Sequence, residues 1–170
     1  IYNKDNRTQM QVNTEALGNA WLVDEVKLVG SANEEIDALA NVDPSTTAIV
    51  PGQFKDKIRA NYNRLGGISL RTYMPDRLVY DVNVAGDQAL AVFSEIWYGP
   101  NKGWEATMDG KPVDFFRVNY LLRGMNIPQG QHEIVFEFKP SSYHTGNLIA
   151  YICSGLILLL GGYVVYREVK

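Results

Sequence analysis

Apolar and polar residues alternate with a period of two along much of the middle of the chain. Leu78, Tyr80, Val82 and Val84 are separated by polar side chains, which is typical of a β-strand with one buried face. Residues 89–96 (ALAVFSEI), in contrast, are almost all apolar. A short apolar run of this kind predicts a central strand that is buried on both faces.

A hairpin is predicted where the alternating residues 104–108 meet Asp109-Gly110, because this dipeptide readily adopts the positive φ angles of a tight turn. The chain is expected to return over residues 111–118. Pro112 should then lie on a sheet edge, since proline has no N–H to donate to a neighbouring strand.

A second turn is predicted at residues 128–130 (PQG), between strands over residues 120–126 and 132–138, because proline and glycine favour chain reversal. The inward-facing side chains of the later strand are expected to be Ile134, Phe136 and Phe138.

Nearer the N-terminus the pattern changes from strand to helix and back. Residues 21–29 (WLVDEVKLV) predict a first strand. Ser31 and Glu34 are three residues apart, as in a capping box at the start of a helix, and the short helix is expected to end before Asp43-Pro44. Residues 46–50 are rich in β-forming side chains and predict another short strand.

The regular spacing of these short strands favours a mainly β fold. We expect an antiparallel β-sandwich, jelly-roll-like, with one short helix, covering residues 16–140. Residues 1–15 are polar and show no period, so they are interpreted as a connector. Residues 141–147 are interpreted as a linker to the C-terminal segment.

The C-terminal segment is expected to be a transmembrane helix. Residues 148–166 (LIAYICSGLILLLGGYVVY) contain no charged side chain, and as a helix they span about 28 Å, close to the hydrocarbon thickness of a bilayer. A buried core helix is the alternative, but the rest of the chain is barely large enough to surround one. Arg167 and Lys170 place the tail, residues 167–170, in the cytoplasm by the positive-inside rule, so residues 1–147 should face outside.

Small residues recur at intervals of four or eight along this segment. Such spacing lets a second membrane helix approach closely, although chance in a glycine-rich span is an equal alternative. The candidate packing residues are Gly146, Ala150, Ser154 and Gly162.

The start of the chain bears on how an outward-facing domain is exported. The sequence begins at Ile1 and has no apolar segment near its start. We therefore expect the chain to be the C-terminal piece of a longer membrane protein, and a cleaved signal peptide is the other explanation.

Composition narrows the classes of function. The 16 basic and 19 acidic residues give a net charge of -3, which does not support a nucleic-acid-binding surface. One cysteine and two histidines leave no intrachain disulfide and little room for a metal centre. The sequence contains no phosphate-binding glycine loop, zinc-ligand spacing or nucleophile elbow. We therefore expect no metal site and no cofactor in this segment.

Acidic residues are scattered over the predicted strands. Two carboxylates on adjacent strands are the arrangement that glycoside chemistry uses, but alternation does not show which strands are neighbours. Surface positions are the favoured interpretation of these carboxylates.

Three aromatic residues, Trp97, Tyr98 and Trp104, flank a polar loop at residues 99–103. They are candidate glycan contacts, because the C–H-rich faces of sugars stack on aromatic rings while hydroxyl groups bond to the rim. A place in the core or at the membrane interface is the favoured alternative, since tryptophan and tyrosine are common in both.

Residues 51–67 are basic, and a basic stretch near a membrane suits anionic lipid phosphates. A solvated loop is the commoner outcome for such a stretch. The candidate lipid- or phosphate-contact residues are Lys55, Lys57, Arg59 and Arg64.

Several longer strings resemble a known family when they are taken together. They are ALGNAWLVDEV at residues 16–26, AVFSEIWYGPNKGWEATMDGKPV at residues 91–113, FRVNYLLRGMNIPQGQHEIVFEFKP at residues 116–140 and the closing YHTGNLIAYICSGLILLLGG. Over nearly all of residues 16–166 the chain resembles the C-terminal end of YfhO-type bacterial membrane proteins. The loop before Gly103-Trp104 is longer than the compact Tyr-Pro-Gly-Trp form of that family.

The resemblance implies a long polytopic protein, similar to glycosyltransferases that take a sugar from a polyprenyl-phosphate carrier and glycosylate cell-envelope polymers. The catalytic acid of such enzymes is expected upstream, so none is assigned here. This chain would be the extracytoplasmic accessory domain and last helix in the bacterial cytoplasmic (inner) membrane, with residues 1–147 facing the periplasm or outside.

The implied partners are the lipid bilayer, upstream transmembrane helices of the same protein, and an envelope glycan or polyprenyl-linked sugar. The alternative is a membrane-anchored carbohydrate- or protein-binding or structural module with no enzymatic role.

Overall fold

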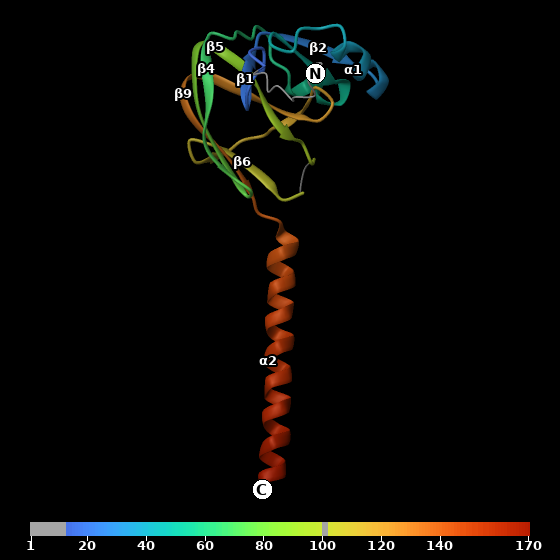
Figure 1. Ribbon diagram of the computed structural model, residues 1–170, viewed down its shortest axis with the longest axis vertical. Coiled ribbons are helices and arrows are strands. Elements are labelled where there is room, and N and C mark those ends of the chain that lie inside the picture. The colour runs from blue at the N-terminus through green and yellow to red at the C-terminus, as the bar shows by residue number, and fades with distance from the viewer. Residues whose placement is uncertain (1–12, 100–101) are drawn as a thin grey trace, which may run out of the picture.

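The computed structural model describes residues 13–99 and 102–170. A β-rich body carries one long C-terminal helix that projects away from it (Figure 1). Of the predicted connector, residues 1–12 lie outside the described part of the chain.

Most strands of the body belong to one antiparallel sheet. The strand order in this sheet is β1-β5-β9-β6-β7. In addition, β4 pairs with β5 and β8 pairs with β9. Strands β2 and β3 form a separate parallel pair. In chain order the elements are β1 (Ala20–Val23), β2 (Glu25–Val29), α1 (Ala32–Leu39), β3 (Thr47–Pro51), the 3₁₀ helix η1 (Gly52–Lys57), β4 (Gly66–Met74), β5 (Arg77–Ile96), β6 (Trp104–Met108), β7 (Lys111–Pro112), β8 (Phe116–Val118), β9 (Leu122–Phe138) and α2 (Ser141–Val169). The prediction of a mainly β, antiparallel fold with one short α-helix is confirmed.

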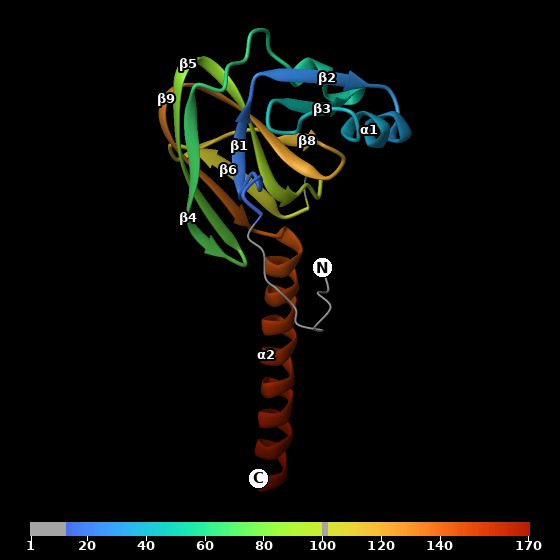
Figure 2. The same ribbon diagram turned by 45° about the horizontal axis from the view of Figure 1, so that its top comes forward.

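The predicted turn at residues 128–130 is wrong, because β9 runs through these residues without reversing. The register between β5 and β9 passes from Val84–Gly130 to Gln88–Pro128, so three residues of β5 lie opposite one residue of β9. Gly130 has a φ of 123°, which glycine adopts without strain. The bulge and the glycine bend both strands together, as bulges commonly do, and Figure 2 shows β5 and β9 curving side by side.

This bend folds the sheet so that its two halves face each other across one core. Tyr80 from the first half of β5 meets Phe93 from the second half at 4.9 Å between ring centroids, and Phe93 meets Phe136 of β9 at the same separation. All three rings are fully buried, and a buried aromatic ring contributes about 1.5–3 kcal/mol. The alternation predicted for the first half of β5 is confirmed, and the finer jelly-roll-like assignment stays a prediction.

Residues 89–93 of β5 are buried on both faces, as predicted, whereas Ser94 and Ile96, which belong to the same predicted run, are exposed. Ala91 and Phe93 face the core between the two halves of the sheet, whereas Leu90 and Val92 pack on the opposite side with Val50 of β3. The parallel pair β2–β3 therefore covers the outer face of this part of the sheet.

The single strand predicted over residues 21–29 is divided in two. Its first part, β1, joins the large sheet, and its second part, β2, joins the parallel pair. The chain changes sheets at Asp24, where the backbone N–H groups of Asp24 and Glu25 both donate to the Thr46 carbonyl. The predicted cap of α1 is confirmed, because the Ser31 hydroxyl accepts a hydrogen bond from the Glu34 N–H.

The predicted hairpin at Asp109-Gly110 is also confirmed. The two residues have φ angles of 52° and 75° and join β6 to β7. Pro112 ends β7, the strand at one edge of the sheet, as expected for a residue without an N–H.

Helix α2 is the one helix in the described part of the chain that is long and apolar enough to cross a membrane. This candidate span covers Thr145–Val169, and none of it is buried by the body. The alternative of a core helix inside a soluble domain is thereby excluded. The predicted segment 148–166 lies within α2, and residues 141–147, for which a linker was predicted, are helical as well.

Helix α1 is fixed to the large sheet by a buried carboxylate. Glu35 is 1% exposed and accepts hydrogen bonds from the Arg117 guanidinium at 3.0 Å and the Tyr120 backbone N–H at 2.8 Å. Next to it, Asn119 exchanges two hydrogen bonds with Ile49 of β3, one through its backbone N–H and one through its side-chain oxygen. These contacts connect the small parallel sheet to the β8–β9 turn.

Replacing Glu35 by Gln should destabilise the body, because it leaves the Arg117 charge without its carboxylate partner. Removal of one partner of a buried pair costs about 3–5 kcal/mol, and the value should fall at the lower end because the Arg117 side chain retains 23% exposure. Chemical unfolding of the full chain in detergent, followed by circular dichroism, measures the difference.

The matched control is Asp37→Asn, which removes an exposed carboxylate from the same helix and should change stability by less than about 0.5 kcal/mol. Equal effects of the two substitutions would contradict a structural role for the buried pair.

Candidate functional site

Trp104, the first residue of β6, stands between two cavities of the body. It pairs in register with Phe138 of β9, three residues before α2 begins. Figure 1 shows β6 at the end of the body from which α2 leaves. Both cavities therefore reach towards the end of the body that carries the helix.

The larger cavity, about 640 Å³ in volume, is called the aromatic cavity below. Trp97 packs edge-on against Phe54 with 5.6 Å between ring centroids, so its ring is held in place. Apolar walls with a few convergent polar groups are typical of a small-molecule site. The aromatic lining residues are Phe54, Trp97, Trp104, Phe115 and Phe116, and the charged ones are Lys57, Glu105 and Asp114.

Lys57 is held at the rim of the aromatic cavity. Its ammonium group forms an ion pair with Asp114 at 2.5 Å, and its backbone carbonyl accepts a hydrogen bond from the side chain of Asn126. A sequence-predicted lipid contact is thus part of a mixed polar and aromatic site, where its charge is paired.

The other three predicted lipid or phosphate contacts do not gather with Lys57 into one basic cluster. Arg64 pairs with Asp24 at 3.4 Å, the Arg59 backbone N–H donates to the Tyr62 hydroxyl, and Lys55 is exposed on η1. Figure 2 shows the loop between η1 and β4 at the end of the body away from α2. A bilayer around the candidate span of α2 would lie at the other end of the body, so this place does not favour contact of the loop with lipid, and that contact stays a prediction.

The smaller cavity, about 440 Å³ in volume, is called the Arg123 cavity below. Tyr98 lies here and is 58% exposed, and Phe138, which was expected to face inward, is 41% exposed. The Phe138 ring is at the surface because it packs on Trp104, at 5.4 Å, and not in the core. The lining residues are Pro75, Glu95, Ile96, Tyr98, Lys102, Trp104, Arg123 and Phe138.

The three predicted glycan contacts are therefore divided between two sites. Trp97 lines the aromatic cavity, Tyr98 lines the Arg123 cavity and Trp104 forms a wall of both. Of the loop at residues 99–103 that they flank, residues 100–101 lie outside the described part of the chain.

Arg123 is a site residue that the sequence reasoning missed. Its side chain is 1% exposed, and its guanidinium lies over the Trp104 ring at 4.3 Å and over the Phe136 ring at 4.9 Å. Burial lowers the pKa of Arg123 from the usual range of arginine, yet the group stays charged. Arg123, Met125 and Ile127 are two residues apart along β9, and Met125 and Ile127 are buried. This period of two is the sequence feature that places Arg123 on the inner face of the strand.

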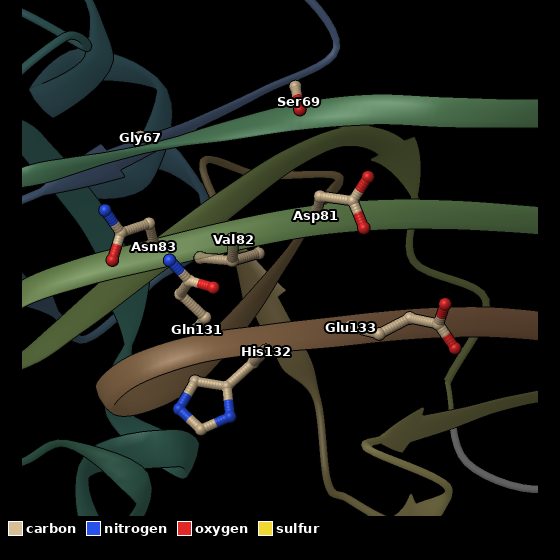
Figure 3. A pocket seen from close by; sticks show the side chains of 8 residues that line it. All are labelled: Gly67, Ser69, Asp81, Val82, Asn83, Gln131, His132 and Glu133. Carbon is tan, nitrogen blue, oxygen red and sulfur yellow. The ribbon is translucent and has the colours of Figure 1, made fainter.

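A third, shallow hollow of about 470 Å³ lies on the outer face of β4, β5 and β9 (Figure 3). Asp81 lies directly opposite Glu133 in the strand register, so two of the scattered carboxylates are neighbours. Arg71 bridges them, donating to Asp81 at 2.9 Å and to Glu133 at a shorter distance. Two half-exposed carboxylates that share one arginine are best explained as a surface ion-pair network.

His132, at the border of this hollow, is paired through the β6–β7 hairpin. Its Nδ1 lies 2.7 Å from the Asp109 carboxylate, whose other oxygen accepts the Glu133 N–H at 2.9 Å. These two hydrogen bonds lower the pKa of Asp109. Within residues 13–99 and 102–170, no three histidine, cysteine or carboxylate side chains are grouped closely enough to hold a metal ion.

The predicted helix-packing residues lie on α2 and are exposed along it. They are Gly146, Ala150, Ser154 and Gly162. A Cβ atom added at Gly146 or Gly162 would meet no neighbouring atom within 4 Å, so the glycines leave a smooth surface for another helix. Packing against a second membrane helix stays a prediction.

Comparison with known families gives one match. The family described as bacterial membrane protein YfhO matches residues 55–150, which is more than half of the 170 residues. The matched range includes both tryptophans of the aromatic cavity, Arg123 and the first residues of α2. No curated protein and no solved structure matches the chain.

The Asp109 carboxylate should make the stability of the body depend on pH. Its pKa in the folded state lies below the usual value of 3.8. Its contribution is therefore fully present above that value and is lost as the pH falls through the lowered one. The difference in unfolding free energy between the wild type and Asp109→Asn should shrink from about pH 5 to about pH 2.

Asparagine suits this position as a test because it tolerates positive φ. Repeating the comparison in a His132→Gln background removes the hydrogen bond that contributes most to the lowered pKa and should reduce the dependence on pH. A stability difference that stays constant over the same range would refute the assignment.

Proposed function

Because the chain belongs to the YfhO family of bacterial membrane proteins, we propose that it is the extracytoplasmic accessory domain and last membrane helix of a YfhO-like protein. In this proposal it assists polyprenyl-phosphate-dependent glycosylation of cell-envelope polymers. The folded sheet acts as a sandwich-like platform, and the aromatic cavity holds part of an acceptor or donor glycan.

The aromatic cavity is the observation that carries the proposal. It combines the rings of Trp97, Trp104 and Phe115 with the paired charges of Lys57 and Asp114. Sugar rings present apolar C–H faces to such rings and hydroxyl groups to the charged rim. An ion pair at the rim offers both a hydrogen-bond donor and an acceptor to those hydroxyl groups.

The place of this cavity supports a role close to the membrane. Phe138, next to Trp104, is followed after two residues by α2. A glycan in the cavity would lie near the outer surface of the bilayer, where a lipid-linked sugar is presented. In the proposal the catalytic acid belongs to the upstream part of the protein, and this domain orients the substrate.

The proposed location is the bacterial cytoplasmic membrane, with residues 1–147 in the periplasm or outside. Arg167 and Lys170 follow the candidate span and favour a cytoplasmic tail. The helix face with Gly146, Ala150, Ser154 and Gly162 would pack against upstream helices of the same protein.

A membrane-anchored binding module without enzymatic role is the second candidate. The aromatic cavity supports it equally, because glycan binding there requires nothing from upstream helices. The gene that encodes the chain distinguishes the two: many apolar spans before Ile1 favour the transferase, and a lone signal peptide favours the binding module.

Replacing Trp97 or Trp104 by Ala should weaken binding of cell-envelope oligosaccharides, and reduce glycan transfer by the whole parent protein. Each lost aromatic contact is worth about 0.5–1.5 kcal/mol, or roughly 2- to 13-fold in affinity. Tryptophan fluorescence during oligosaccharide titration measures binding, and circular dichroism measures whether the body remains folded.

The third tryptophan provides the matched control. The Trp21 indole donates to the Pro44 carbonyl at 2.7 Å, away from the aromatic cavity, so Trp21→Phe should leave binding unchanged. Folded Trp97 and Trp104 variants with unchanged binding and transfer would remove the glycan-contact role.

The orientation of the chain can be tested with single cysteines. In a Cys153→Ala background, which removes the only cysteine, K55C in the body should react with a membrane-impermeant maleimide added outside intact cells. K170C in the tail should react only after the membrane is opened. Labelling of K170C alone in intact cells would reverse the proposed orientation.

A further inference from the structure

Arg123 carries a charge that forms no ion pair within the described part of the chain. Its Nε donates to the Ile96 carbonyl at 3.0 Å, but its Nη1 is buried and has no hydrogen-bond partner. No carboxylate within residues 13–99 and 102–170 lies within 4.0 Å of its guanidinium. A buried cation that forms no ion pair and leaves one N–H group without a hydrogen bond is costly, and an anion that binds to it reduces the cost.

The cavity around Arg123 is suited to a small anionic group. Trp104 covers one face of the guanidinium, which leaves the planar edge of the group as the donor side. Tyr98 and Lys102 add a hydroxyl and an ammonium group to the lining. The fork of N–H groups on arginine matches the oxygen atoms of a phosphate in two parallel hydrogen bonds.

The cavity lies at the level expected for lipid headgroups. Phe138 lines it, α2 begins at Ser141 and the candidate span begins at Thr145. Thr145 follows Ser141 by four residue steps, a rise of about 6 Å along a helix, and the headgroup layer is about 5–8 Å thick on each side of the hydrocarbon core.

An apolar rim surrounds the cavity at this same end. Figure 2 shows the tip of the β4–β5 hairpin beside the start of α2, and this tip carries Tyr73 and Met74. Exposed aromatic and apolar side chains in one area mark an interaction surface, and tyrosine is favoured at the bilayer interface. The exposed residues of this rim are Tyr73, Met74, Ile96, Tyr98 and Phe138.

From this geometry we propose that the Arg123 cavity binds the phosphate group of an anionic membrane lipid, and that the apolar rim docks the body on the bilayer around it. The site is separate from the aromatic cavity and does not depend on glycan binding. Trp104 forms a wall of both cavities, so its surroundings would change when a lipid occupies the Arg123 cavity.

Glu95 also lines the cavity, and its negative charge stabilises the charged form of Arg123, which partly offsets the lowering of the Arg123 pKa by burial. It makes no ion pair with Arg123 within 4.0 Å, so it does not occupy the donor edge. Replacing Glu95 by Gln removes a negative charge from the lining and should tighten phosphate binding.

The test uses the full chain in detergent with Arg167→Gln and Lys170→Gln in the tail, so that the tail contributes no cationic contact. Native mass spectrometry measures the binding of phosphatidylglycerol, which is anionic, against phosphatidylcholine, which is not. The chain should prefer phosphatidylglycerol, and Arg123→Gln should reduce the affinity roughly tenfold, as expected for lost hydrogen bonds to a charged group.

Two exposed lysines provide a matched pair that does not risk the core. Lys102→Gln, in the lining of the cavity, should weaken binding, whereas Lys55→Gln on η1 should not. If Arg123→Gln fails to fold, the lysine pair and the Glu95→Gln variant decide the result.

Equal binding of both lipids by the chain that carries only the two tail substitutions would overturn the proposal. The proposal would also be overturned if Lys55→Gln lost the preference for phosphatidylglycerol and Lys102→Gln retained it. Inorganic phosphate separates the two sources of the same chemistry. Binding of inorganic phosphate that depends on Arg123, without any lipid preference, would overturn the lipid assignment.

Discussion

The joint bend of β5 and β9 is the constraint on which the rest of the body depends. Two extra residues in β5 and the positive φ of Gly130 in β9 turn both strands at the same level. Without the bend, the two halves of the sheet would not share a core, and Tyr80 and Phe136 would not both reach Phe93. The bend also returns the end of β5 to the place where β9 leaves for α2, so that Ile96 and Phe138 line one cavity.

The ends of these two strands determine where chemistry can occur. Because the two strand ends meet next to α2, the polar and aromatic groups of both cavities lie towards the end of the body that carries this helix. Trp104 links the two cavities, since Arg123 lies over its ring and the Phe138 ring packs against it in a tilted arrangement. A glycan in one cavity and a lipid phosphate in the other would therefore contact the same side chain.

Helix α2 and the body of this chain depend on different interactions. Helix α2 adds nothing to the core of the body, because none of its candidate span is buried by protein. The body depends on its own core and on polar anchors such as Glu35, which joins α1 to the sheet through Arg117 and Tyr120. Changes in either part should leave the other folded.

Local patterns in the sequence determined several elements correctly, because their causes are local. The uncharged C-terminal run, the Ser31 cap, the Asp109-Gly110 hairpin and the two-sided burial of residues 89–93 all depend on neighbouring residues. Alternation also identified the inner face of β5. Resemblance to the YfhO family extended this to a membrane setting, and the family match confirmed it.

The tertiary structure alone decided which distant groups meet. Proline and glycine at residues 128–130 suggest a turn, but hydrogen bonding to a bulged neighbour converts the same residues into a bend within a strand. The pairing of Asp81 with Glu133 and the lack of a hydrogen-bond partner for Nη1 of Arg123 follow from strand register and from the folding of the sheet. Period-two alternation assigns a side chain to a face, but only the three-dimensional pairing of strands assigns its neighbours.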